Sequence, residues 1–255
     1  MAKLTFDPKW HRYYLDGKPV PSVSKILGQV DKPQLVAWSA RITAEYIVSR
    51  IPDILSGDLI LTPDDVKQLA RDAKTEYMKI SKKACDIGTA THKAVEKYLK
   101  TGKKPKGLPK EIQTPFDAFL IFAKEMKLGK IIESEKMLYS SYGYCGTLDI
   151  VAEIVDPKYS PNKQKYILDI KTSKGFYKEM PKQLAAYLYG YTEKEKLNPA
   201  DYGIGIIRLD KETGLPYFKN YSKIKEVSFK QFICLLEHLE LEEEVKQKGE
   251  WNGNV

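Results

Sequence analysis

Residues 146–154, GTLDIVAEI, and residues 166–173, YILDIKTS, are apolar, β-branched segments, and each holds an aspartate inside a run typical of an interior strand. A turn over residues 156–162 would make the two segments antiparallel neighbours. Residues 131–141, IIESEKMLYSS, would supply a third strand ahead of them. The sequence therefore predicts a three-stranded antiparallel meander in the second half of the chain.

Apolar residues spaced three and four apart predict helices on both sides of the meander. The predicted helices cover about 34–50, 62–83, 85–100, 110–127, 181–196 and 228–248, and further strands are predicted at 200–210 and 215–222. Near the start, Asp16-Gly17 predicts a hairpin turn, and Pro21 and Ser22 introduce a short helix.

The predicted fold class is α+β, with a central mixed sheet that contains the meander and is flanked by helices. An N-terminal hairpin and helical lobe is expected over residues 1–83 and a core over residues 84–255. Both are expected to form one compact unit, because no repeat, low-complexity tract or linker separates them.

The composition excludes several classes of protein. No apolar run is long enough to span a bilayer, and the N-terminus lacks a secretory signal, so a soluble cytoplasmic protein without a membrane partner is expected. Cys85, Cys145 and Cys234 are far apart and form no CxxC pair, which argues against a disulfide framework or a four-thiolate metal site.

The net charge of +8 favours a polyanionic partner. Residues 97–110 carry much of it, with several lysines and no acid, although such a segment can also be a solvated surface. These lysines are Lys97, Lys100, Lys103, Lys104, Lys106 and Lys110.

Asp169 and Lys171 are two residues apart on a predicted strand, so their side chains share one face. Alone, the pair could be a structural ion pair. Asp149 on the preceding strand can lie opposite Asp169, and two facing carboxylates are stabilised by a divalent cation such as Mg²⁺ or Mn²⁺. Lys171 could then orient water and stabilise charge on a phosphate, which is the chemistry of phosphodiester hydrolysis.

Two helical pairs at i and i+4 could face the same site. His92 and Glu96 are one pair, and Gln183 and Tyr187 are the other. A structural histidine and a surface or capping pair are the alternative interpretations.

Together, GTATHKAVE (88–96), GTLD (146–149), DIKT (169–172) and QLAAY (183–187) resemble the RecB-like branch of the PD-(D/E)xK nucleases. PSVSKIL (21–27) is similar to a segment of its mitochondrial genome maintenance and phage members. The resemblance implies a restriction-endonuclease-like fold that binds one or two Mg²⁺ or Mn²⁺ ions. No iron–sulfur cluster is expected, because the four cysteines that hold it in some members are missing.

The resemblance also implies roles for individual residues. His92, Asp149, Asp169 and the Ile170 carbonyl would be metal ligands, and Lys171 would be the catalytic lysine acting with the two aspartates. The implied strand-positioning residues are Gln183 and Tyr187.

The expected function is a DNA nuclease, and by analogy an exonuclease on single-stranded or end-bearing DNA in replication, recombination or repair in a bacterial or phage-infected cell. Nearby cations would contact the phosphates, and Phe176 and Tyr177 would either stack on bases or pack internally. The candidate cations are Lys103, Lys104, Lys174, Lys178 and Lys182.

Two other functions remain open. One is a nuclease-fold protein that binds nucleic acid without cutting it. The other is a zinc hydrolase using His92 and Glu96, which is disfavoured because HExxH is absent. Glu96, Glu133 and Glu135 are further acids near the motifs, and they rank below the main set because a solvated face explains them equally well.

Overall fold

The computed structural model describes residues 3–57 and 61–249. The chain forms two compact units, one made of residues 31–89 and the other of the residues up to Val30 together with those from Ala90 onward. This division differs from the predicted lobe over 1–83, because the N-terminal hairpin belongs to the unit that contains the main sheet.

The unit of residues 31–89 is helical. It contains α2 (Pro33–Val48), α3 (Ile51–Leu55) and the first part of α4 (Pro63–Thr101). The two helices predicted at 62–83 and 85–100 are wrong as separate elements, because α4 is continuous over 39 residues. No proline lies between them, and Gly88 alone does not end a helix.

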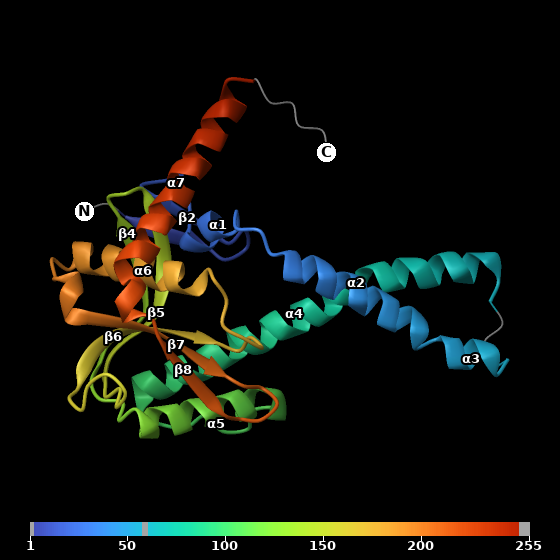
Figure 1. The fold of residues 1–255 in the computed structure, drawn as a ribbon, viewed down its shortest axis with the longest axis horizontal. Coiled ribbons are helices and arrows are strands. Elements are labelled where there is room, and N and C mark those ends of the chain that lie inside the picture. Colours follow the sequence, from blue (N-terminus) through green and yellow to red (C-terminus); the bar gives the residue numbers. More distant parts are fainter. Residues whose placement is uncertain (1–2, 58–60, 250–255) are drawn as a thin grey trace. The chain divides into compact units, whose positions relative to one another are not determined.

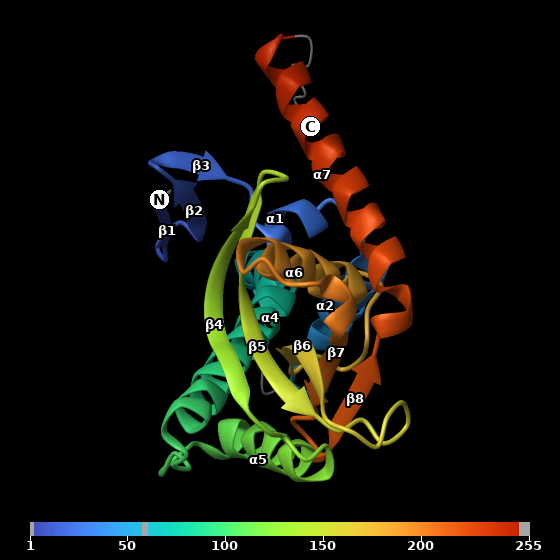
Figure 2. The same ribbon diagram turned by 90° about the vertical axis from the view of Figure 1, so that its left-hand side faces the viewer.

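The main sheet has five strands in the order β4-β5-β6-β7-β8. The strands are β4 (Ile131–Ser140), β5 (Tyr144–Ile154), β6 (Gln164–Lys171), β7 (Tyr202–Leu209) and β8 (Pro216–Asn220). The pairs β4–β5 and β5–β6 are antiparallel, which confirms the meander, whereas β6 and β7 are parallel. The α+β class and the mixed sheet are therefore confirmed (Figure 2).

Helices cover both faces of this sheet. On one face, α6 (Met180–Lys194), α7 (Lys225–Gln247) and α1 (Val23–Leu27) pack over Val151 and Ile167. On the other, α5 (Lys110–Glu125) and the end of α4 pack over Ile150 and Leu168 (Figure 1). Because neighbouring strand residues point to opposite faces, Asp149 and Asp169 belong to the face that α6 covers. Short 3₁₀ helices, η1 (Pro199–Asp201) and η2 (Ser222–Ile224), flank β7 and β8.

The N-terminal segment forms a three-stranded antiparallel sheet of β1 (Leu4–Asp7), β2 (Arg12–Leu15) and β3 (Lys18–Val20). The predicted turn is confirmed, with φ of 48° at Asp16 and 81° at Gly17. Ser22 caps α1, as predicted, by accepting a hydrogen bond from the Lys25 amide at 3.1 Å. The Cys145 amide donates to the Pro21 carbonyl at 3.0 Å, which joins this sheet to the start of β5.

Within residues 3–57 and 61–249, no helix is both long and apolar enough to cross a membrane. All three cysteines are free, and burial raises the pKa of the Cys145 thiol to about 12. That thiol is therefore uncharged near neutral pH.

Candidate metal centre

The register of β5 against β6 brings the two predicted aspartates together. Ile150 pairs with Leu168 and Val151 pairs with Ile167. One step further along the ladder, Asp149 lies opposite Asp169. Asp169 is only 1% exposed, so a carboxylate is buried near the end of β6, opposite the middle of β5.

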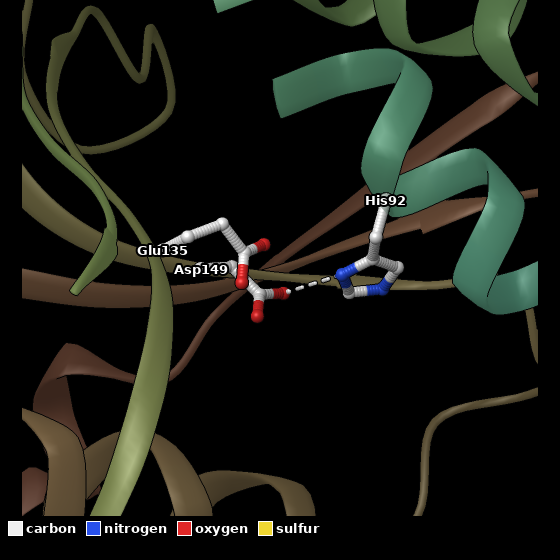
Figure 3. A group of neighbouring side chains, drawn as sticks. All are labelled: His92, Glu135 and Asp149. Atoms are coloured by element: carbon white, nitrogen blue, oxygen red, sulfur yellow. Dashed lines mark ion pairs between the residues drawn. The ribbon is translucent and has the colours of Figure 1, made fainter. Parts of the chain in front are cut away.

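His92, Glu135 and Asp149 form a compact cluster from α4, β4 and β5 (Figure 3). One nitrogen or oxygen from each residue lies within 4.8 Å of the other two. Two of the three were predicted as ligands, whereas Glu135 had been ranked below the main set. The signal for Glu135 lies in the strand pairing, because Ser134 pairs with Ile150 and Lys136 with Leu148, so Glu135 falls opposite Asp149.

The two nitrogens of the His92 ring contact different partners. Its Nε2 lies 2.9 Å from the Ile170 carbonyl oxygen, which can only accept a hydrogen bond, so Nε2 carries the proton. Nδ1, the other ring nitrogen, lies 3.4 Å from Asp149 Oδ2. With Nε2 engaged by the carbonyl, Nδ1 is the ring nitrogen that faces the two carboxylates of the cluster.

The Ile170 backbone stabilises both residues. Its amide donates to Asp149 Oδ2 at 2.8 Å, and its carbonyl accepts from His92. A backbone carbonyl that accepts the second N–H of a metal-ligating histidine is the usual way in which proteins orient that ring. The structure thus brings the predicted ligand Ile170 to the cluster, where its carbonyl contacts His92.

The Glu135 carboxyl is partly buried and lies close to a second carboxylate. Burial is the largest cause that raises its pKa, to about 7, and the Asp149 carboxylate adds to the effect. His92 and Lys100 act in the opposite direction. The Glu135 backbone has a φ of 52°, a left-handed conformation that is uncommon for a residue other than glycine.

Asp169 and Lys171 form an ion pair beside the cluster, with Lys171 Nζ 2.7 Å from Asp169 Oδ2. Burial raises the pKa of Asp169 to about 6, although the Lys171 ammonium lowers it. Burial opposes the charge of Lys171, but the Asp169 and Asp149 carboxylates together raise its pKa. Among the predicted metal ligands, Asp169 is therefore the residue whose carboxylate forms an ion pair with Lys171.

The second helical pair is also close to the aspartates. Gln183 Nε2 donates to the Tyr187 hydroxyl at 3.2 Å. Burial raises the pKa of Tyr187, and the next largest cause is the Asp169 carboxylate. The Tyr187 ring packs so closely on β5 that a Cβ added at Gly146 would lie 2.8 Å from it.

The predicted phosphate-binding lysines are dispersed. Lys174 lines a cavity of about 190 Å³ with Thr172, Ser173 and Asp210. The Lys182 ammonium donates to the Lys178 carbonyl at 2.8 Å.

Lys103 and Lys104 are exposed just after the end of α4. That end is about 14 Å along the helix from His92, at 1.5 Å per residue.

The two predicted stacking aromatics differ in their environment. Phe176 packs against the core, and its ring centroid lies 5.8 Å from the Arg208 guanidinium and 5.4 Å from the Lys219 ammonium. Tyr177 is 36% exposed. For Phe176, the packing interpretation is the one that the structure supports.

The sequence matches no protein-family model and no curated protein.

Proposed function

We propose that this chain is a metal-dependent deoxyribonuclease of the PD-(D/E)xK type, with a restriction-endonuclease-like core built on β4–β7 and α6. The observation that carries the proposal is the cluster of one imidazole and two carboxylates, in which His92 Nδ1 lies 3.4 Å from Asp149 Oδ2 and Glu135 supplies a third possible ligand atom. A lysine held by a buried aspartate lies beside them.

The donor set fits Mg²⁺ or Mn²⁺. It offers carboxylate oxygens and one neutral imidazole, and none of the free cysteines belongs to it. Oxygen-rich sites with one imidazole suit Mn²⁺ and Mg²⁺, whereas Zn²⁺ sites favour nitrogen and sulfur ligands. The raised pKa of Glu135, caused first by burial and then by the Asp149 carboxylate, supports the same conclusion, because a nearby cation favours the charged form of both carboxyls.

Bound in this cluster, a divalent cation would withdraw charge from a phosphodiester oxygen and lower the pKa of water. Asp169 keeps the Lys171 ammonium charged and fixed at the strand end. From there Lys171 would stabilise negative charge that builds on the phosphate during hydrolysis. Gln183 and Tyr187 would position the scissile strand on the side of the site that α6 covers.

We further propose that the substrate is single-stranded or end-bearing DNA, cut from its ends during replication, recombination or repair. The test is digestion of an end-labelled linear single strand beside a covalently closed circular one, in Mg²⁺ or Mn²⁺, with EDTA and Lys171→Ala as controls. Loss of the linear strand alone, abolished by both controls, is the expected result.

Other outcomes would change the proposal. Cutting of both substrates would make the protein an endonuclease. Binding of the strand without cutting would favour a nucleic-acid-binding protein that has no catalysis. Rescue of the EDTA-treated protein by Zn²⁺ alone would favour a zinc hydrolase.

A further inference from the structure

A cavity of about 600 Å³ lies between the N-terminal sheet, α1 and α7. Its size is in the range of small-molecule sites, and none of the residues that line it belongs to the metal centre. Its lining includes Trp10 and His11 from the turn before β2 and Arg12 and Tyr13 from β2 itself, and these four residues form the wall discussed below. Lys25 of α1 and Glu243 of α7 also line it.

Trp10 lies on this wall, in a turn that hydrogen bonds hold in place. Its side chain is 63% exposed, which is unusual for the largest apolar side chain. The Asp7 carboxylate accepts hydrogen bonds from the Lys9 amide at 2.8 Å and the Trp10 amide at 3.3 Å, so the turn that carries the ring is fixed. The Lys9 ammonium lies 5.3 Å from the ring centroid.

The wall is cationic as well as aromatic. Lys9 and Arg12 are both exposed beside Trp10. The acid that lines the cavity, Glu243, is 2.8 Å from Lys25, which offsets its charge. An aromatic ring with cations beside it matches a nucleotide, whose base stacks on the ring while its phosphate contacts the cations.

Tyr13 connects this cavity to the metal centre. Its ring lines the cavity, and its hydroxyl is 2.9 Å from Thr147 Oγ1, two residues before Asp149 on β5. Burial raises the pKa of Tyr13, and the Glu135 carboxylate is close enough to add to that rise. Tyr13 therefore joins the cavity to the strand that carries Asp149.

We propose that this cavity binds one unpaired nucleotide of the DNA strand next to the scissile phosphate, with the base stacked on Trp10 and the phosphate contacted by Arg12 and Lys9. The inference rests on the proposed nuclease function and names the part of the substrate that must be single-stranded. A base within a duplex has both faces covered by its neighbours and could not stack on Trp10.

The test is equilibrium binding of a fluorescein-labelled single-stranded oligonucleotide in EDTA, followed by anisotropy, so that cleavage does not enter the measurement. Trp10→Ala should weaken binding about tenfold, within the range measured for loss of one base–aromatic stack. Trp10→Tyr should restore most of the affinity because it keeps an aromatic face. Because the side chain at position 10 is exposed, neither substitution should change the melting temperature of the protein.

A matched control variant is Tyr159→Ala, which removes another exposed aromatic with a lysine near its ring, 44% exposed and 5.8 Å from Lys223 Nζ. It should bind like the wild type. An abasic site moved along the oligonucleotide should weaken wild-type binding most at one position. At that position Trp10→Ala should add no further loss, since the stacked base is already missing.

Equal affinity of the wild type and Trp10→Ala would overturn the inference, as would a tenfold loss that persists unchanged at every abasic position. Failure of the nuclease proposal would look different. Metal-dependent cutting would be absent, while the Trp10-dependent binding in EDTA would remain.

Discussion

Replacing Glu135 by glutamine tests whether the cluster of His92, Glu135 and Asp149 is built for a cation. The substitution keeps the length and shape of the side chain and removes its charge. If the carboxylate is crowded by Asp149 in the absence of metal, Glu135→Gln should stabilise the metal-free protein. If Glu135 is also a ligand, the same change should weaken stabilisation by metal.

The size of the first effect follows from the acidity of Glu135, whose pKa rises from 4.5 to about 7. For a fully buried group this rise corresponds to about 3.4 kcal/mol, at about 1.4 kcal/mol for each pH unit. Glu135 is only partly buried, so solvent screening reduces the expected gain to about 1–2 kcal/mol.

The sign of the pH dependence is fixed by the same rise. The folded protein holds the Glu135 proton more tightly than the unfolded chain does, so the free energy of unfolding should fall as pH rises from about 4.5 to 7. Above pH 7 the full difference between wild type and Glu135→Gln should be present. At pH 4 or below, Glu135 is protonated in both the folded and the unfolded wild type. Its charge should then make no difference between the unfolding free energies of the wild type and Glu135→Gln.

The assay is urea unfolding at pH 8 and pH 4, in EDTA and in Mn²⁺. At an Mn²⁺ concentration a hundredfold above its Kd, the wild type should gain about 2.7 kcal/mol, and Glu135→Gln should gain less. Glu133→Gln is the matched control on the same strand, because Glu133 pairs with Lys136 at 2.8 Å and should give no stabilisation. A Glu135→Gln protein that is no more stable in EDTA at pH 8, or that gains as much from Mn²⁺, refutes the reasoning.

Three further predictions concern the remaining parts of the site. Lys171→Ala should lower the single-turnover cleavage rate by about 10²–10³-fold, as for loss of a charge-stabilising donor, and a rate near that of the wild type would contradict its catalytic role. Asp149→Asn should weaken Mn²⁺ binding at least about tenfold by calorimetry, because it removes a charged ligand; an unchanged Kd would exclude Asp149 from the metal site. Replacing Lys103, Lys104 and Lys106 together by glutamine should reduce the salt dependence of single-strand affinity by a slope of about 2, and an unaltered slope would remove this segment from the binding surface.

The sheet could be predicted from the sequence because its signals are local. The β-branched segments at 146–154 and 166–173 are bounded by turn residues, and their strands β5 and β6 differ from the predicted ranges by only a few residues. The sequence did not predict α4 as one continuous helix, because the apolar spacing weakens near Lys83. The structure shows that the helix continues through this point. The boundary at Asp31 and Thr89 has no sequence signal, since no linker marks it.

The site was predictable where it depends on spacing and not where it depends on pairing. Asp169 and Lys171 share a face because they are two residues apart, and the ion pair weighed for them is present at 2.7 Å. Glu135 becomes a neighbour of Asp149 only through the β4–β5 register, which shifts between Ile131 and Glu133. A one-residue shift changes which side chains reach a given face, so no pattern within β4 could select Glu135 over Glu133.

Glu135 combines two unfavourable features that a structural strand residue would not need. Its left-handed backbone, with φ of 52°, costs on the order of 1 kcal/mol or more for a residue that is not glycine, and its carboxyl is held near Asp149 and His92 with a raised pKa. Glycine or asparagine would relieve the backbone, and glutamine would relieve the charge. The cation that we propose between Glu135, Asp149 and His92 would offset the charge, and it would account for a backbone geometry that brings the Glu135 carboxylate to the other two residues, which a solvated acidic face would not explain.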